Sequence, residues 1–197
     1  MKEQIVQTSL KQFLTYGIKS MKMQKLAADI GISTKTLYKH FSDKEALLQE
    51  CLKVHYGATD REIQNMLNDD ASPVVLLFRC YAKSMELDFG TSHLFYHDLN
   101  YYYPLLQDKA IRLYGGKAFT VLNDTIKKGI ADGYFLPYLQ PAVVMQAITV
   151  LYTSVTRQDT YKKFKLKPTD LAKHTINIYL RGICTEKGLE IMDELTN

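Results

Sequence analysis

The sequence predicts an all-α protein, and three observations lead to that prediction. Apolar residues recur at spacings of three and four along most of the chain, which is the period of an amphipathic helix. No Asn-Gly or Asp-Gly dipeptide lies between alternating apolar runs, so the usual hairpin signal is missing. Glycine and proline are few in 197 residues, 10 and 5, and most stand where a helix would begin or end.

The composition is that of an ordinary globular protein. Hydrophobic residues make up 46% and charged residues 23%, which excludes a disordered or low-complexity chain. The net charge of +4 is too small to indicate a nucleic-acid partner by itself. The three cysteines have neither zinc nor redox spacing. With no signal-like or membrane-spanning apolar run, we expect a cytoplasmic protein with no membrane partner and no cofactor.

The first fifty residues are expected to form helices separated by tight turns. Gly17 and Gly31 each follow an amphipathic stretch, which is the usual place of a left-handed helix stop. Ser33 then offers an N-cap oxygen to the next helix. We therefore expect one helix up to Gly17, a second over residues 23–30 and a third over residues 34–41.

A capping box is expected to open the fourth helix, with Ser42 at the N-cap and Glu45 three positions later. This helix should run to about Leu67. Proline and glycine signals then divide the remaining chain into further helices. The expected ranges are 73–89, 92–103, 105–131, 142–155 and, as the last, 169–184.

Most of the excess positive charge lies in the first quarter of the chain. Residues 1–50 contain eight lysines and five acidic residues, and the first arginine is Arg61. A basic patch on a small helical unit is typical of a DNA-binding surface. A solvated surface without a partner would have the same composition, so charge alone leaves both interpretations open.

Residues 23–41 contain the parts of a helix-turn-helix: two short helices joined by a Gly-Ile-Ser turn. Ala27 is small enough for the helices to approach closely, and Ile32 can fill the space between them. The second helix would bury Leu37 and Phe41. Its opposite side is polar and basic, which suits entry into the major groove. That side carries Thr34, Lys35, Thr36 and Lys39.

Residues 17–48 resemble the TetR family of bacterial transcriptional regulators. The similar pieces are Leu-Ala before the turn, Gly-Ile-Ser in it, Thr-Leu-Tyr-x-His-Phe in the recognition helix and Ser-x-Lys-Glu-x-Leu-Leu after it. Beyond about fifty residues only the helical layout and the length agree. The resemblance implies a helix-turn-helix DNA-binding domain over residues 1–50, with the motif at about 22–41. A larger helical domain for effector binding and dimerisation would follow over residues 51–197.

The resemblance also implies which residues contact DNA. Tyr38, His40 and Lys44 match phosphate-binding positions, although core packing of Tyr38 and simple exposure of His40 are alternatives. Lys35 departs from the family, which commonly has a small residue there, and Lys22 stands where Ser or Thr often caps the second helix. The expected DNA contacts are Lys22, Ser33, Thr34, Lys35, Thr36, Tyr38, Lys39, His40 and Lys44.

Aromatic side chains are concentrated between Phe78 and Phe119, where there are ten. Aromatic walls with a few polar tips suit a small-molecule pocket, but an ordinary helical core would show the same pattern. Because the resemblance implies an effector pocket in this domain, we expect an apolar or aromatic effector. The candidate pocket residues are Phe78, Tyr81, Met85, Phe95, Tyr96, His97, Phe119 and Tyr152.

His93 and His97 are four residues apart, with Asp98 adjacent, which is a metal-ligand spacing on a helix. The sequence fixes no third ligand. Two histidines at this spacing often share a helix face by coincidence, and we therefore expect no metal site.

Residues 133–156 contain no charged side chain, and the helix expected there is apolar almost all round. Such a helix must be covered on more than one side, by a second subunit or by its own chain. The resemblance implies that the last two long helices of each subunit form a four-helix dimer interface. The candidate interface residues are Val143, Ala147, Val150, Leu151, Ile176 and Leu180.

These observations predict a homodimeric, ligand-responsive regulator that binds a palindromic operator in double-stranded DNA, most often as a repressor. An activator, or a regulator controlled by a protein partner, would have the same fold. A helical enzyme or ligand carrier is the competing class. The sequence lacks Gly-x-Ser-x-Gly, His-Glu-x-x-His and a phosphate-binding loop, so we expect no catalysis.

Overall fold

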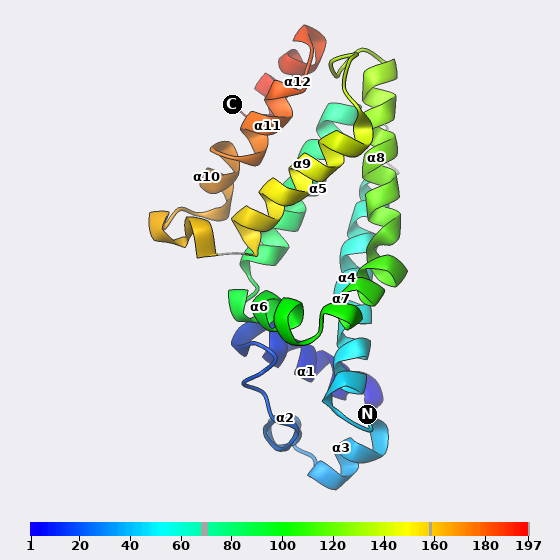
Figure 1. Cartoon of the computed structure of the whole chain (residues 1–197), viewed down its shortest axis with the longest axis vertical. Coiled ribbons are helices and arrows are strands. Elements are labelled where there is room, and N and C mark those ends of the chain that lie inside the picture. The colour runs from blue at the N-terminus through cyan, green and yellow to red at the C-terminus, as the bar shows by residue number, and fades with distance from the viewer. Residues whose placement is uncertain (68–70, 158, 197) are drawn as a thin grey trace. The chain divides into compact units, whose positions relative to one another are not determined.

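The computed structural model describes residues 1–67, 71–157 and 159–196, and these residues are largely helical (Figure 1). Within them, β pairing is limited to an isolated antiparallel bridge between Phe135 and Cys184. The all-α prediction is confirmed. The chain divides into two compact units, each with its own apolar core. One comprises Met1–Asp60 and Thr91–Gly116, and the other Arg61–Gly90 and Lys117–Asn197.

The first unit contains the predicted N-terminal helices together with two helices from later in the chain. Ile5 and Phe13 of its first helix are fully buried in a core that also holds Phe95 and Tyr96. The expected domain boundary at residue 50 lies inside a helix. The helices of this unit are α1 (Lys2–Tyr16), α2 (Met23–Ile30), α3 (Thr34–His40), most of α4 (Lys44–Leu67), α6 (His93–Tyr102) and α7 (Pro104–Ala110).

The N-cap of α4 differs from the prediction by one residue. The Asp43 carboxylate, not the Ser42 hydroxyl, accepts the free N–H of Ala46, at 2.8 Å. Ser42 donates its hydroxyl hydrogen to the other Asp43 oxygen, at 3.0 Å. The predicted capping box is therefore wrong in register. A carboxylate is the better cap because it accepts a charge-assisted bond at the positive end of the helix.

The long helix expected over residues 105–131 is interrupted by a wider turn. A π-helical turn, η1 (Ile111–Gly115), separates α7 from α8 (Gly116–Ala131). A Cβ added to Gly116 would meet no other atom within 4 Å, so close approach of a neighbour does not explain this glycine. The π turn lies where the sequence has two glycines, and such turns are local expansions of an α-helix.

The second unit is built around α5, whose start follows the expected Ser-Pro signal. The Ser72 hydroxyl accepts the N–H of Val75, at 3.3 Å, and Pro73 occupies the first turn, where no N–H is needed. Val74, Leu77 and Ile148 are among its buried core residues. Its helices are α5 (Pro73–Phe89), α8, α9 (Pro141–Thr156), the 3-10 turn η2 (Asp159–Phe164), α10 (Pro168–Lys173), α11 (Ile176–Gly182) and α12 (Glu186–Thr196).

The C-terminal region contradicts the prediction of one last helix over residues 169–184. That stretch is split into α10 and α11, because Thr175 has the non-helical backbone angles φ −133° and ψ −92°. A further helix, α12, then follows. Its Gly188 lies against Tyr134, and a Cβ there would come within 2.3 Å of the Tyr134 carbonyl oxygen. A glycine that disfavours a helix locally is therefore required by tertiary packing.

Candidate DNA-binding surface

The turn between α2 and α3 has the geometry expected of a helix-turn-helix. Gly31 adopts the left-handed conformation, φ 81° and ψ 29°, and ends α2. The N–H of Ile32 donates to the Ala27 carbonyl at 3.0 Å, which closes the end of the helix. The predicted N-cap is confirmed, since the Ser33 hydroxyl accepts the N–H of Thr36 at 3.0 Å. Figure 1 shows α2 and α3 joined by this short turn.

Helix α3 has one apolar side and one polar, exposed side. Leu37 is fully buried and Phe41, which follows the helix, is 4% exposed, so this side is covered by the first unit's own core. Tyr38 is 46% exposed, which rules out burial of the whole ring. Of the predicted contacts on α3, Lys35, Lys39 and His40 are exposed as well, and Thr34 and Thr36 are half-buried.

One predicted DNA contact, Lys22, lies before α2 and not on α3. Lys22 is exposed at the N-cap of α2, and its backbone is extended with φ −82° and ψ 151°. No side chain caps α2 at this position, so Lys22 does not replace the missing Ser or Thr as a cap. Acidic residues are absent from α3 itself. The exposed side of α3 thus combines lysine, hydroxyl and imidazole donors without a carboxylate.

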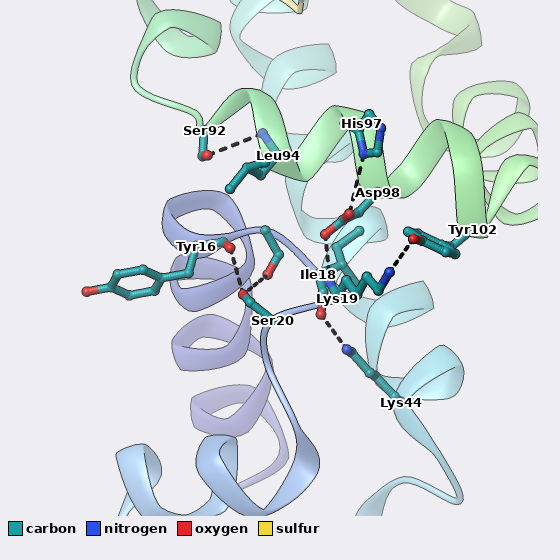
Figure 2. A network of polar contacts seen from close by, with 11 residues as sticks. Tyr16, Ile18, Lys19, Ser20, Lys44, Ser92, Leu94, His97, Asp98 and Tyr102 are labelled. Carbon is teal, nitrogen blue, oxygen red and sulfur yellow. Dashed lines mark hydrogen bonds and ion pairs between the residues drawn. The ribbon is translucent and has the colours of Figure 1, made fainter.

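Two predicted DNA contacts are already engaged within the chain. Ser33 accepts the cap bond described above, and its oxygen lies 2.8 Å from the Thr36 hydroxyl oxygen. Lys44 is half-buried, and its ammonium donates to the Ile18 carbonyl (Figure 2). The Phe13 ring centroid lies 6.0 Å from this ammonium. Burial lowers the pKa of Lys44. The ammonium has three donors, and one of them is used to hold the chain itself.

The predicted pocket residues do not form one cluster. Phe95 and Tyr96 are fully buried in the core of the first unit. Tyr81 and Tyr152 belong to the second unit, where their ring centroids lie 6.0 Å apart. Met85 is buried and Phe78 half-buried in that same unit. The remaining two predicted residues are more than half exposed, the His97 side chain at 64% and Phe119 at 53%.

A buried carboxylate that the sequence analysis did not identify lies beside Tyr152. Asp88, which is 7% exposed, accepts the Tyr152 hydroxyl at 2.9 Å and the Arg157 Nε–H at 3.1 Å. The guanidinium carbon of Arg157 lies 5.8 Å from the Tyr152 ring centroid. This polar group is the kind of feature that orients a ligand in an otherwise apolar site. No spacing rule would have found it, because Asp88 and Arg157 are 69 residues apart.

The predicted interface residues fall into two groups. Val143 and Val150 are 61% and 60% exposed, and Ala147 and Leu151 are half-buried. Ile176 and Leu180 are 1% and 2% exposed, so their own chain covers them and they present no surface to a partner. That part of the prediction is wrong in register, because α11 begins only after the break at Thr175. The residue that α11 exposes instead is Ile178, at 60%.

Metal-ligating side chains do not cluster in the described part of the chain. Within residues 1–67, 71–157 and 159–196, no three or more His, Cys, Asp or Glu side chains gather closely enough to hold a metal ion. Of His93 and His97, the second lies 3.6 Å from the Asp98 carboxylate. Among the helices of the same residues, none has the length and apolar character of a membrane span.

Comparison with known proteins identifies the helix-turn-helix. A family model described as bacterial regulatory proteins, tetR family, matches residues 5–51, from α1 into α4. Over these residues the chain is similar to the TetR family of bacterial regulatory proteins. Members of this family are regulators and not enzymes.

The curated relatives match different shares of the chain. An uncharacterized HTH-type transcriptional regulator, YerO of Bacillus subtilis, is 34% identical over 68 residues, which is 34% of this chain and 24% of YerO. The HTH-type transcriptional repressor KstR2 of Mycolicibacterium smegmatis is 25% identical over 158 residues, 75% of this chain and 73% of KstR2.

The fold is shared along nearly the whole chain. FadR of Bacillus subtilis, solved in complex with stearoyl-CoA, has a TM-score of 0.76 and 18% identity over 93% of this chain and 100% of that one. The chain therefore has the fold of these structures, an N-terminal helix-turn-helix followed by further helices.

Proposed function

We propose that this regulator is a homodimeric repressor that a small apolar or aromatic effector releases from a palindromic operator. Residues 1–50 would bind DNA, and residues 51–197 would bind the effector and form the dimer. The observation that carries the proposal is the free, basic side of α3, where Lys35, Tyr38 and Lys39 are exposed together. A protein that binds chromosomal DNA in this way works in the cytoplasm.

The DNA contacts follow from the exposed groups. The N-terminal turn of a recognition helix meets base edges in the major groove, so Thr34, Lys35 and Thr36 are the residues proposed to read the sequence. Tyr38, Lys39 and His40 lie one turn later and are proposed to bind phosphates. Because residues 1–50 contain no arginine, bidentate recognition of guanine by arginine does not contribute, and DNA shape takes a larger share of specificity.

The dimer contact is proposed to use the outer side of α9. Val143, Ala147 and Val150 are spaced i, i+4 and i+7, so they share one helix face. Two of them are more than half exposed, while Val144, Met145 and Ile148 on the other side are buried in the core. Ile178 of α11 takes the place of Ile176 and Leu180 in this proposal. In a dimer that binds a palindrome, two recognition helices would read half-sites about 34–36 Å apart, one turn of DNA.

The effector is proposed to bind near the aromatic side chains of the second unit. Tyr81, Met85 and Tyr152 supply apolar surface there, and Asp88 with Arg157 supplies a polar group. The repressor KstR2 and FadR, a regulator solved with stearoyl-CoA, are similar to this chain. The first similarity supports repression over activation, and the second supports an apolar ligand. The effector would release DNA only through its different affinities for two conformations.

Selection from a random duplex library tests the DNA-binding part. The purified protein should enrich an inverted repeat whose half-sites lie about one helical turn apart. Enrichment of no sequence, or of a single half-site, would contradict the proposal. Val143→Asp with Val150→Asp should convert the protein to a monomer by analytical ultracentrifugation and abolish binding to the repeat. Leu87→Asp, at a residue 43% exposed on α5, is the matched control that should remain dimeric.

A second experiment tests the effector class. Stearoyl-CoA, free coenzyme A and a panel of monocyclic phenols would each be titrated into the complex of protein and selected duplex. At least one acyl or aromatic compound should release the DNA, while coenzyme A alone should not. Release by coenzyme A alone, or by none of the compounds, would count against an apolar or aromatic effector.

A further inference from the structure

The turn over residues 17–20, which joins α1 to α2, is held by contacts from two other helices (Figure 2). The Asp98 carboxylate of α6 accepts the backbone N–H of Lys19 at 2.7 Å. The Lys44 ammonium at the start of α4 donates to the Ile18 carbonyl. Two successive residues of this turn are therefore bound, one from each side, by charged groups that α6 and α4 supply.

The same turn approaches α6 too closely for any side chain at Gly17. Gly17 has φ 81° and ψ 162°, a conformation that is essentially restricted to glycine. A Cβ there would lie 2.9 Å from the Leu94 Cβ and 3.0 Å from an Asp98 oxygen. Next to it, the Ser92 N–H donates to the Leu14 carbonyl at 2.7 Å. The start of α6 thus lies directly against the end of α1 and the turn that follows.

Charge is concentrated around Asp98. Its side chain is 9% exposed, and His97 Nδ1 lies 3.6 Å from its second oxygen. Lys19 donates its ammonium hydrogen to the Tyr102 hydroxyl at 2.5 Å, one helical turn further along α6. A buried carboxylate is costly unless it is hydrogen-bonded, so the Lys19 N–H is a needed partner for Asp98.

Apolar packing already holds α6 against α1, because Phe95 and Leu99 on α6 and Phe13 on α1 are fully buried in one core. Such packing has no strong directional preference. The hydrogen bond from the Lys19 N–H to Asp98 is directional, and Lys19 lies three residues before Lys22, the N-cap of α2. It therefore fixes the position from which the helix-turn-helix starts.

We propose that Asp98 is a positioning residue for operator binding: its hydrogen bond to the Lys19 N–H fixes the start of α2 and, through α2, the position of α3 on the operator. This inference rests on the proposed DNA-binding function. Asp98 itself touches no DNA. It acts on the contacts made by α3 through the turn and α2.

Two near-isosteric variants separate the hydrogen bond from the space that the side chain fills. Asp98→Asn keeps an oxygen that accepts the Lys19 N–H, whereas Asp98→Leu fills similar volume without an acceptor. Hydrogen exchange at the Lys19 amide should become at least about tenfold faster in Asp98→Leu and stay close to wild type in Asp98→Asn. Asn100→Ala, at an exposed residue on the same helix, is the control and should leave this exchange rate unchanged.

The deciding measurement is the affinity of each variant for the selected duplex and for a random-sequence duplex of equal length. Asp98→Leu should lose at least about tenfold affinity for the selected duplex and less than about threefold for the random one, because mispositioned recognition helices still meet phosphates. A fraction of unfolded protein would lower both affinities equally. Asp98→Asn should remain within about threefold of wild type on both duplexes.

Three results would overturn the proposal: equal losses on both duplexes, no loss on either, or a selective loss in Asp98→Asn as large as that in Asp98→Leu. If Asp98→Leu does not fold, Asp98→Ala replaces it with the same expectations. Failure of the proposed function is distinguishable from these, because the wild-type protein would then show no preference for the selected duplex at all.

Discussion

The two turns that flank α2 begin with glycines of the same φ, 81°, yet their surroundings differ. Turn 17–20 lies against α6 and α4, and a Cβ on Gly17 would collide with Leu94 and Asp98. In the turn over residues 31–33, a Cβ on Gly31 would meet no other atom within 4 Å. Their ψ angles also differ, 162° at Gly17 and 29° at Gly31.

This difference separates two roles that a glycine turn can have. The left-handed conformation of Gly31 serves only to end α2 and to place Ser33 as the cap of α3. The second turn is therefore determined by its own residues. Gly17 needs both its conformation and its lack of a side chain, because the first turn is packed between two helices. A perturbation of the first turn should therefore reach the rest of the unit, and one of the second should stay within the motif.

The largest expected effect is the difference in stability between the variants Gly17→Asn and Gly31→Asn. Asparagine tolerates the left-handed region of Gly31 but not the ψ of Gly17, where it also meets Leu94. Gly17→Asn should destabilise the protein by about 2–5 kcal/mol from strain and overpacking together. Gly31→Asn should change stability by less than about 0.5 kcal/mol. Urea unfolding of the full chain measures both, and similar losses would show that the two turns are equivalent.

A smaller loss is expected when alanine replaces Gly31. No atom stands in the way of the methyl group, so only the left-handed backbone opposes it, and the alanine also restricts the unfolded chain. Gly31→Ala should cost about 1 kcal/mol in the free energy of unfolding. The matched variant Gly17→Ala should cost at least twice as much. A loss at Gly31 as large as that at Gly17 would mean that the second turn is packed as tightly as the first.

Removal of the α3 cap tests whether the second turn is local. Ser33→Ala leaves the Thr36 N–H without its side-chain acceptor and should destabilise the protein by about 1 kcal/mol. Ser33→Asp restores an acceptor and should recover that stability, while its negative charge should weaken DNA binding. Exchange at the Lys19 amide should be unchanged in Ser33→Ala. Faster exchange there would show that the two turns are coupled.

The smallest effect is the pH dependence of the α4 cap. Hydrogen bonds from the Ala46 N–H and the Ser42 hydroxyl lower the pKa of Asp43. A lowered folded-state pKa stabilises the protein fully above the unfolded-state pKa, and this stabilisation is lost as the pH falls through the folded-state value. Asp43→Ala should lower the melting temperature near neutral pH, and the difference should shrink below about pH 4. If the difference in melting temperature did not change with pH, the ionised Asp43 carboxylate would not be the cap of α4.

Where the sequence marks helix ends with glycine, serine or proline, the predicted fold agrees with the structure. α2 and the helices from α4 to α6 begin and end within about two residues of their expected bounds, because Gly31, Pro73 and Gly90 act locally. The break at Thr175 was missed because no glycine or proline marks it, and helix α12 was missed because a glycine lies inside it. From the sequence alone, Gly188 argues against a helix. The structure explains this glycine, because the Tyr134 carbonyl leaves no space for a side chain there.

The candidate site was predictable in part for the same reason. The exposed side of α3 follows from periodicity once Leu37 is assigned to the core, and Ser33 follows from capping preference. That Lys44 binds the Ile18 carbonyl, 26 residues away, could not be read from the sequence. Nor could the Asp98 contact with Lys19, which joins residues 79 apart. Long-range polar contacts carry no periodic signal.

The salt dependence of operator binding tests most directly the claim that the exposed basic side of α3 lies against DNA. Lys35→Ala with Lys39→Ala would be compared with a control that removes two exposed lysines of α8, Lys117→Ala with Lys128→Ala. The slope of log K against log salt should weaken by about 0.9 for each phosphate that the α3 variant no longer neutralises, and stay at the wild-type value in the control. Equal slopes in the wild type and the α3 variant would contradict the claim.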